Sequence, residues 1–119
     1  MYTNLPIFKQ SLDLNVYIED AVRNFSKFNK YGIGSELREK SREILYAIYR
    51  VYFSTNKIET ILKLRDSIEE LKITIYLAKE LKALRDFKQF EILSRLVREL
   101  AKQAQGWLKS QSFYSCKKG

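Results

Sequence analysis

The stretch "KIETILKLRDSIEELKITIYLAKE" (residues 57–80) decides the fold class of this chain. Apolar residues recur in it at alternating spacings of three and four positions: Ile61, Leu64, Ile68, Leu71, Ile75 and Ala78. Such spacing puts all of them on one face of an α-helix and is typical of helices that pack in bundles or coiled coils. The pattern predicts a long amphipathic helix over residues 57–85.

Three other segments have the same kind of periodicity. It predicts helices over residues 8–25, 28–54 and 87–110, each with one apolar face. The last segment, 111–119, has no periodic apolar face, and we expect it to be disordered. Four long helices joined by short links form an up-down-up-down four-helix bundle. We therefore expect an all-α protein with a single domain over residues 1–119.

Composition argues against catalysis. Among its 119 residues the chain has one cysteine and no histidine. The usual general base near neutral pH is therefore missing, and the usual ligand sets of a zinc site cannot be assembled. Acidic neighbours such as Glu69 and Glu70 fit solvated helix pairs better than an acid-base dyad. We expect no enzymatic activity, no metal and no cofactor.

The location of the protein is predicted from what its sequence lacks. Its longest uncharged apolar runs, such as "ILYAIY" at 44–49, fall far short of the roughly 20 residues that span a bilayer. Nothing near the first residue resembles a signal peptide. We expect a cytoplasmic protein that does not associate with a membrane.

Positive charge is concentrated in two links. The chain carries 22 Lys and Arg against 14 Asp and Glu, a formal charge of +8. In an up-down-up-down bundle the first and third links lie at the same end, and both are basic: Lys27, Lys30 and Arg38 belong to the first link, and Lys79, Lys82, Arg85 and Lys88 belong to the third. These cations either bind an anionic partner or are ordinary solvated charges. Tyr31 and Phe87 supply rings that stack on bases if the partner is a nucleic acid.

Some apolar residues lie off the main stripes of the third and fourth helices: Leu62, Ile73, Leu77, Ile92 and Leu96. They either widen the core face of each helix or form an interface between subunits. We expect a homo-oligomer.

Two glycines stand near the start of the second helix, in "NKYGIGSELREKS" (29–41). Ser26 or Asn29 can cap that helix, which places Gly32 and Gly34 in its first turns. The missing side chains either let a neighbouring element pack closely or leave backbone open to a phosphate or a protein loop.

Four stretches of the chain resemble a known family: "LPIFKQSLDLNVYI", "NFSKFNKYGIGSELREKSREIL", "LKITIYLAKEL" and "GWLKS". In this order they are similar to the accessory variability determinant proteins of diversity-generating retroelements. That family belongs to a four-helix-bundle superfamily, which also contains proteins encoded in intervening sequences of bacterial large-subunit rRNA genes. The similarity covers roughly residues 5–110.

The resemblance implies a function. It implies a basic, non-catalytic homo-oligomer of five bundles arranged as a barrel, which binds the element's reverse transcriptase and its template RNA, or DNA, and supports mutagenic reverse transcription and retrohoming. Lys72 matches a basic contact position of the family, whereas Tyr76 stands where a second arginine is expected. The alternative is a structural or scaffolding bundle of the rRNA-linked kind, with weak and general nucleic-acid binding.

Overall fold

The protein is built from helices. A computed structural model describes the backbone of residues 1–118 and the side chains of residues 1–113. Within that part the chain forms a 3₁₀ turn and five α-helices: η1 (Tyr2–Asn4), α1 (Pro6–Arg23), α2 (Lys27–Tyr31), α3 (Ile33–Phe53), α4 (Lys57–Glu80) and α5 (Phe87–Lys118). None of the described residues forms a strand. The all-α prediction is confirmed.

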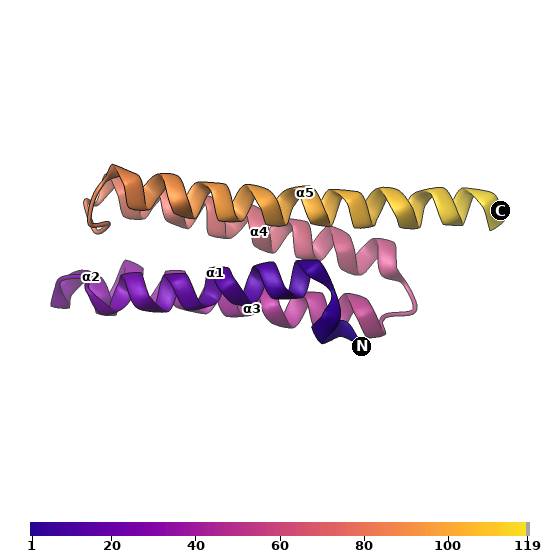
Figure 1. Ribbon diagram of the computed structural model, residues 1–119, viewed down its shortest axis with the longest axis horizontal. Helices are drawn as coiled ribbons and strands as arrows, with labels where there is room; N and C mark the ends of the chain where they lie inside the picture. The colour runs from indigo at the N-terminus through magenta and orange to yellow at the C-terminus, as the bar shows by residue number, and fades with distance from the viewer. Residues whose placement is uncertain (119) are drawn as a thin grey trace.

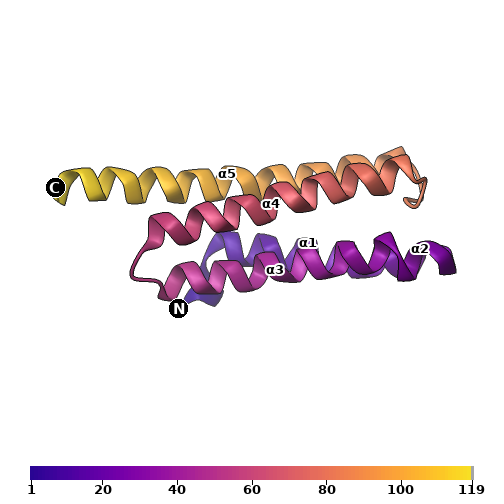
Figure 2. The same cartoon turned by 180° about the vertical axis from the view of Figure 1, so that it is seen from behind.

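The long helices lie in two layers, α1 with α3 and α4 with α5 (Figures 1 and 2). α1 packs against α3 and α5, and α4 also packs against α3 and α5. Each long helix is therefore antiparallel to its neighbours, as in an up-down-up-down four-helix bundle. As a result, α2 and the α4–α5 link lie at one end of the molecule, and the N-terminus and the α3–α4 link lie toward the other (Figure 1).

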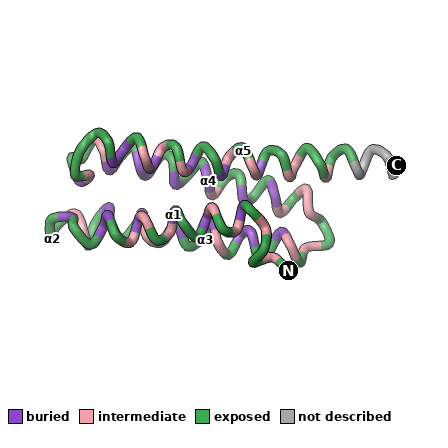
Figure 3. Tube along the Cα trace, viewed as in Figure 1, coloured by how far each residue is buried: buried purple, intermediate pink, exposed green. Residues whose placement is uncertain are grey.

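The predicted apolar stripes form the core. All six stripe residues of α4, from Ile61 to Ala78, are at most 2% exposed. Figure 3 shows buried residues recurring along the long helices. Ser41 is buried in the stripe of α3, where its hydroxyl donates to the carbonyl of Arg38 and accepts from the amide of Asn15 on α1. These hydrogen bonds explain how the core accommodates a polar residue.

The first two predicted helices differ from the observed ones. α1 begins at Pro6, since proline fits the first turn of a helix, and it ends at Arg23 instead of residue 25. The predicted helix over 28–54 is two helices, because Gly32 interrupts it with φ −98° and ψ −106°. The side chain of Ser26 accepts a hydrogen bond from a backbone N–H of α2 and caps it, which confirms one of the two predicted caps.

The last two helices differ in where they end. α4 stops at Glu80 instead of residue 85, because Lys82 adopts a left-handed conformation with φ 58°. α5 begins at Phe87 as predicted but continues to Lys118 instead of stopping at residue 110. The prediction of a disordered tail is therefore wrong for residues 111–118, which contain neither proline nor glycine. Gly119 lies outside the described residues.

Gly34 is required for close packing. It is buried, and a Cβ atom there would lie 2.8 Å from Cγ1 of Val22 and 2.9 Å from the carbonyl oxygen of Asn29. The close-packing interpretation is confirmed at this position, and a buried backbone cannot receive a phosphate. Gly106 differs, since a Cβ there would meet nothing within 4 Å.

Among the described residues, no helix combines the length and the apolar character that crossing a bilayer requires.

Candidate nucleic-acid interface

The two basic links lie at the same end of the bundle, as the topology predicts (Figure 1). They belong to different layers, however. Lys27 and Lys30 stand on α2, beside α1 and α3, whereas Lys82 and Arg85 stand on the link between α4 and α5. The predicted cations therefore form two groups.

Arg38 of the first group already has a partner within the bundle. Its Nε donates to Oε2 of Glu19 at 2.9 Å, and Nη2 of Arg42 donates to Oε1 of the same carboxylate at 2.7 Å. Two arginines of α3 thus hold one glutamate of α1. Arg38 thus joins α1 and α3, and its role in binding a ligand stays a prediction. Lys27 is exposed and Lys30 is half-buried.

The α4–α5 link is capped at both ends. Ala83 N–H donates to the carbonyl of Ala78 at 3.0 Å and closes α4. The side chain of Asp86 accepts from the N–H of Gln89 at 2.9 Å and caps α5. This N–H has the largest influence on the pKa of Asp86 and lowers it. Desolvation opposes this effect, and the Arg85 guanidinium at 3.2 Å adds to the lowering, so the pKa lies below its ordinary value. Arg85 is thereby partly engaged, whereas Lys82 and Lys88 are exposed.

Lys79 lies among aromatic rings. Its Nζ is 4.8 Å from the ring centroid of Phe90 and 5.9 Å from those of Tyr76 and Phe87. Cations at such distances are attracted to the faces of aromatic rings. We call these four residues the aromatic cluster. Lys79 and Phe87 were predicted as binding residues, whereas their contacts with Tyr76 and Phe90 were not, because sequence spacing does not reveal which rings meet across two helices.

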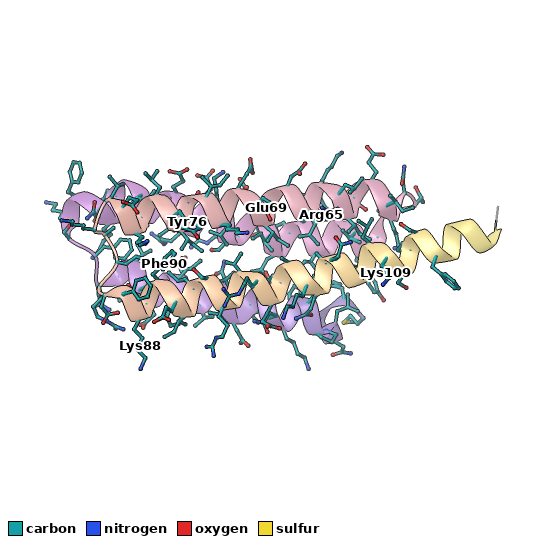
Figure 4. All side chains as sticks on the ribbon, turned by 90° about the horizontal axis from the view of Figure 1, so that it is seen from above. Arg65, Glu69, Tyr76, Lys88, Phe90 and Lys109 are labelled. Carbon is teal, nitrogen blue, oxygen red and sulfur yellow. The ribbon has the colours of Figure 1, made fainter. Side chains whose placement is uncertain are left out.

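A groove runs along the bundle between α4 and α5, starting at Tyr76. It consists of two adjoining hollows of about 310 and 240 Å³, which share Ile68, Glu69 and Ala101 as lining residues. The charged residues that line this α4–α5 groove are Arg65, Glu69, Lys72, Arg98 and Lys102. Figure 4 shows this face, with Tyr76 and Phe90 toward the linked ends of the two helices and Arg65 and Glu69 further along α4.

The groove is strongly basic, with four cations against one carboxylate. Lys72 Nζ lies 4.0 Å from Oε2 of Glu69, and Lys102 Nζ lies 3.9 Å from Oε1 of Glu99. Both pairs are largely exposed and contribute little to stability. The groove therefore presents positive charge that is only partly neutralised.

Only Lys72 of this groove was predicted as a site residue. A usable signal for Arg65 was its spacing from Lys72 and Lys79, which follow it at intervals of seven positions. Seven residues are about two helical turns, so these cations lie on one side of α4, about 10 Å apart. The sequence interpretation placed Lys79 in a basic link and Lys72 at a contact position of the family, and it did not single out Arg65 as a binding residue.

The predicted interface residues divide into two groups. Leu62, Ile73 and Leu77 on α4 are 43%, 66% and 45% exposed. Ile92 and Leu96 on α5 are half-buried, and Leu96 packs against the core. The wider-core interpretation therefore holds for Leu96, and the α4 residues remain candidates for an interface.

A second set of rings, at the other end of the bundle, was missed. The ring of Tyr2 in η1 has its centroid 5.4 Å from that of Phe8, 5.2 Å from that of Tyr49 and 5.9 Å from that of Phe53. These contacts hold η1 against α1 and α3. They explain the position of the N-terminal turn.

The acidic side chains of the described residues do not gather into a metal site. No group of three or more His, Cys, Asp or Glu in that part of the chain is placed to hold a metal ion. Every buried side-chain nitrogen or oxygen of these residues has a hydrogen-bond partner. No orphaned polar atom among them marks a ligand site.

Comparisons with known proteins identify no family. Neither the models of protein families nor the curated proteins gave a match to this chain. The resemblance to accessory variability determinant proteins therefore stays a hypothesis. The α4–α5 groove is the feature from which function can be argued.

Proposed function

We propose that the protein is a non-catalytic accessory factor that binds nucleic acid through the α4–α5 groove. The observation that carries this proposal is the placement of Arg65, Lys72, Arg98 and Lys102 along one groove with a single lining carboxylate. Rows of cations in a groove follow the phosphate backbone of a nucleic acid. These cations stand on two packed helices, so their spacing is fixed before binding.

The family resemblance supports a narrower version of the proposal. The partners are then the reverse transcriptase and the template RNA of a diversity-generating retroelement, and the protein supports mutagenic reverse transcription and retrohoming. A reverse-transcriptase gene beside a pair of near-identical repeats in the genome would support this version. A location inside an rRNA gene would instead support the scaffolding alternative.

The groove is tested by removing two of its charges. Fluorescence anisotropy with a labelled single-stranded RNA should give a steep loss of affinity with salt, since each neutralised phosphate contributes a slope of about −0.7 in log affinity against log salt. Replacing Lys72 and Arg98 by glutamine should reduce that slope by about 1.4.

A matched control separates the groove from net charge. Lys9 on α1 and Arg50 on α3 are exposed and lie outside the groove. Replacing both by glutamine removes the same charge and should leave the slope nearly unchanged. An equal reduction of the salt slope in the two double variants would refute the groove as the binding site. Equally strong competition by polyglutamate would indicate an acidic protein as the partner.

Self-association is the second part of the proposal. Ile73 and Leu77 are exposed on α4, and exposed apolar residues that lie together often mark association surfaces. We propose a homo-oligomer, and the family resemblance implies a pentamer. Light scattering coupled to size exclusion should report several subunits, and Ile73→Glu with Leu77→Glu should dissociate them. A wild-type particle of 14.1 kDa would refute this part.

A further inference from the structure

The aromatic cluster is continuous with the α4–α5 groove. Tyr76 lines the groove, and its ring meets that of Phe90 edge to face, with centroids 5.3 Å apart. The ring of Phe87 lies 5.7 Å from that of Phe90. A strand that follows the groove toward the link therefore arrives at a set of aromatic rings.

Two of these rings are exposed and one supports them. Phe90 is 8% exposed, whereas Tyr76 is 52% and Phe87 is 61% exposed. Phe90 is thus part of the core and holds its neighbours in place. A purely structural role, in which the rings cover the end of the hydrophobic core, would explain the burial of Phe90, but it does not explain why Phe87 is exposed.

Lys79 adds a positive charge at the same place, where it is partly neutralised by Glu80, whose Oε1 lies 3.9 Å from Nζ of Lys79. This Nζ lies 5.9 Å from the centroids of both exposed rings. A nucleotide presents a flat base together with a phosphate. Proteins that hold single strands combine aromatic rings, on which bases stack, with cations that follow the backbone. The cluster offers both groups within one small area.

We infer that Phe87 and Tyr76 form a stacking site for an unpaired base, and that the protein therefore binds single-stranded nucleic acid in preference to duplex. The inference rests on the proposed function of the groove. Bases within a duplex are already stacked on one another and cannot reach these rings, whereas unpaired bases can be splayed onto aromatic side chains. Removing one stacking ring should weaken single-strand binding roughly 10-fold.

The probe is a 12-nucleotide single-stranded RNA with one 2-aminopurine, compared with the same strand in a duplex. We expect the single strand to bind at least 10-fold more tightly than the duplex and its 2-aminopurine fluorescence to be quenched. Phe87→Leu keeps an apolar side chain but removes the ring, so it should lose the preference and the quenching. The salt slope, which reports the groove cations, should persist in this variant.

Tyr46→Leu is the matched control, because Tyr46 is 60% exposed on α3, away from the cluster. It should change neither the preference nor the quenching, and circular dichroism should show both variants folded. Equal binding of the two RNA forms by the wild type, or an unchanged preference in Phe87→Leu, would overturn the inference while leaving the groove intact. Absence of binding to either form would overturn the proposed function and this inference with it.

Discussion

Replacing Lys82 by glycine should make the protein more stable. Lys82 has φ 58°, in the left-handed region that costs a residue with a Cβ atom about 1–2 kcal/mol. The end of α4 requires this conformation. Lys82 N–H donates to the carbonyl of Lys79, and Ala83 N–H donates to the carbonyl of Ala78, both at 3.0 Å. These two bonds form a Schellman motif, in which glycine is the favoured residue at the position of Lys82.

The net gain in the free energy of unfolding is smaller than the backbone strain that the substitution removes. Glycine adopts the left-handed conformation freely, but it also gives the unfolded chain more freedom, which offsets about 0.5–1 kcal/mol. Lys82→Gly should therefore raise the free energy of unfolding by about 0.5–1 kcal/mol. For a chain of 119 residues this is an increase of about 2–4 °C in Tm.

Thermal unfolding followed by circular dichroism measures the change. Lys63 is exposed in the interior of α4, so Lys63→Gly should lower stability by about 1 kcal/mol. Replacing lysine by glycine should thus raise the free energy of unfolding at one position and lower it at another about twenty residues away. Lys82→Ala removes the charge but keeps the strain, and it should not reproduce the gain. A Tm for Lys82→Gly below that of the wild type would refute the reasoning.

Four other substitutions test the packing and the caps. Gly34→Ala should destabilise the protein by about 1–3 kcal/mol in urea unfolding, because the new Cβ atom would lie 2.8 Å from a side chain of α1. Gly106→Ala should stabilise the protein by about 1 kcal/mol, because a Cβ atom there meets nothing within 4 Å. Lys57→Met should cost about 1.5–3 kcal/mol by the same assay, since Nζ donates to three carbonyls at the end of α3 at 2.8–3.2 Å; an unchanged midpoint would contradict this role. The pKa of Asp86 is lower in the folded protein than in the unfolded chain, where it is about 3.9. The charged carboxylate therefore stabilises the fold at pH values above about 3.9, and this stabilisation is lost as the pH falls through the folded pKa. Asp86→Asn should therefore flatten the fall of Tm with pH in that range, as melts at a series of pH values would show.

The core of the bundle was readable from the sequence because apolar spacing reports directly on burial. The residues from Ile61 to Ala78 recur at three and four positions, and all are buried. Helix ends were harder to predict. The end of α4 depends on Lys82, a residue type that gives no sign of a left-handed conformation, and on Ala83, which is buried against the core. Neither glycine nor proline marks this boundary.

The site could be predicted only as far as topology determines it. An up-down bundle brings the two basic links to one end whatever their side chains do. The partners of those side chains depend on contacts between helices that sequence spacing does not reveal. Arg38 meets Glu19 across α1 and α3, and Lys79 meets rings from the first turn of α5. The sequence thus predicted that the two basic links share one end, but neither the groove along α4 and α5 nor which charges are already engaged.

The capped link also explains how the groove acquires a fixed pattern of charge. Only residues 81–86 separate α4 from α5, so a short connection sets the register between the two antiparallel helices. Counting outward from the link, residues at similar distances line the same hollow, as Lys72 and Arg98 do. The groove cations of α4, Arg65 and Lys72, are seven residues apart and those of α5, Arg98 and Lys102, are four apart, and the fixed register brings both pairs to one groove. An anionic strand would find these charges already aligned, because the link that Lys82→Gly should stabilise is the one that aligns them.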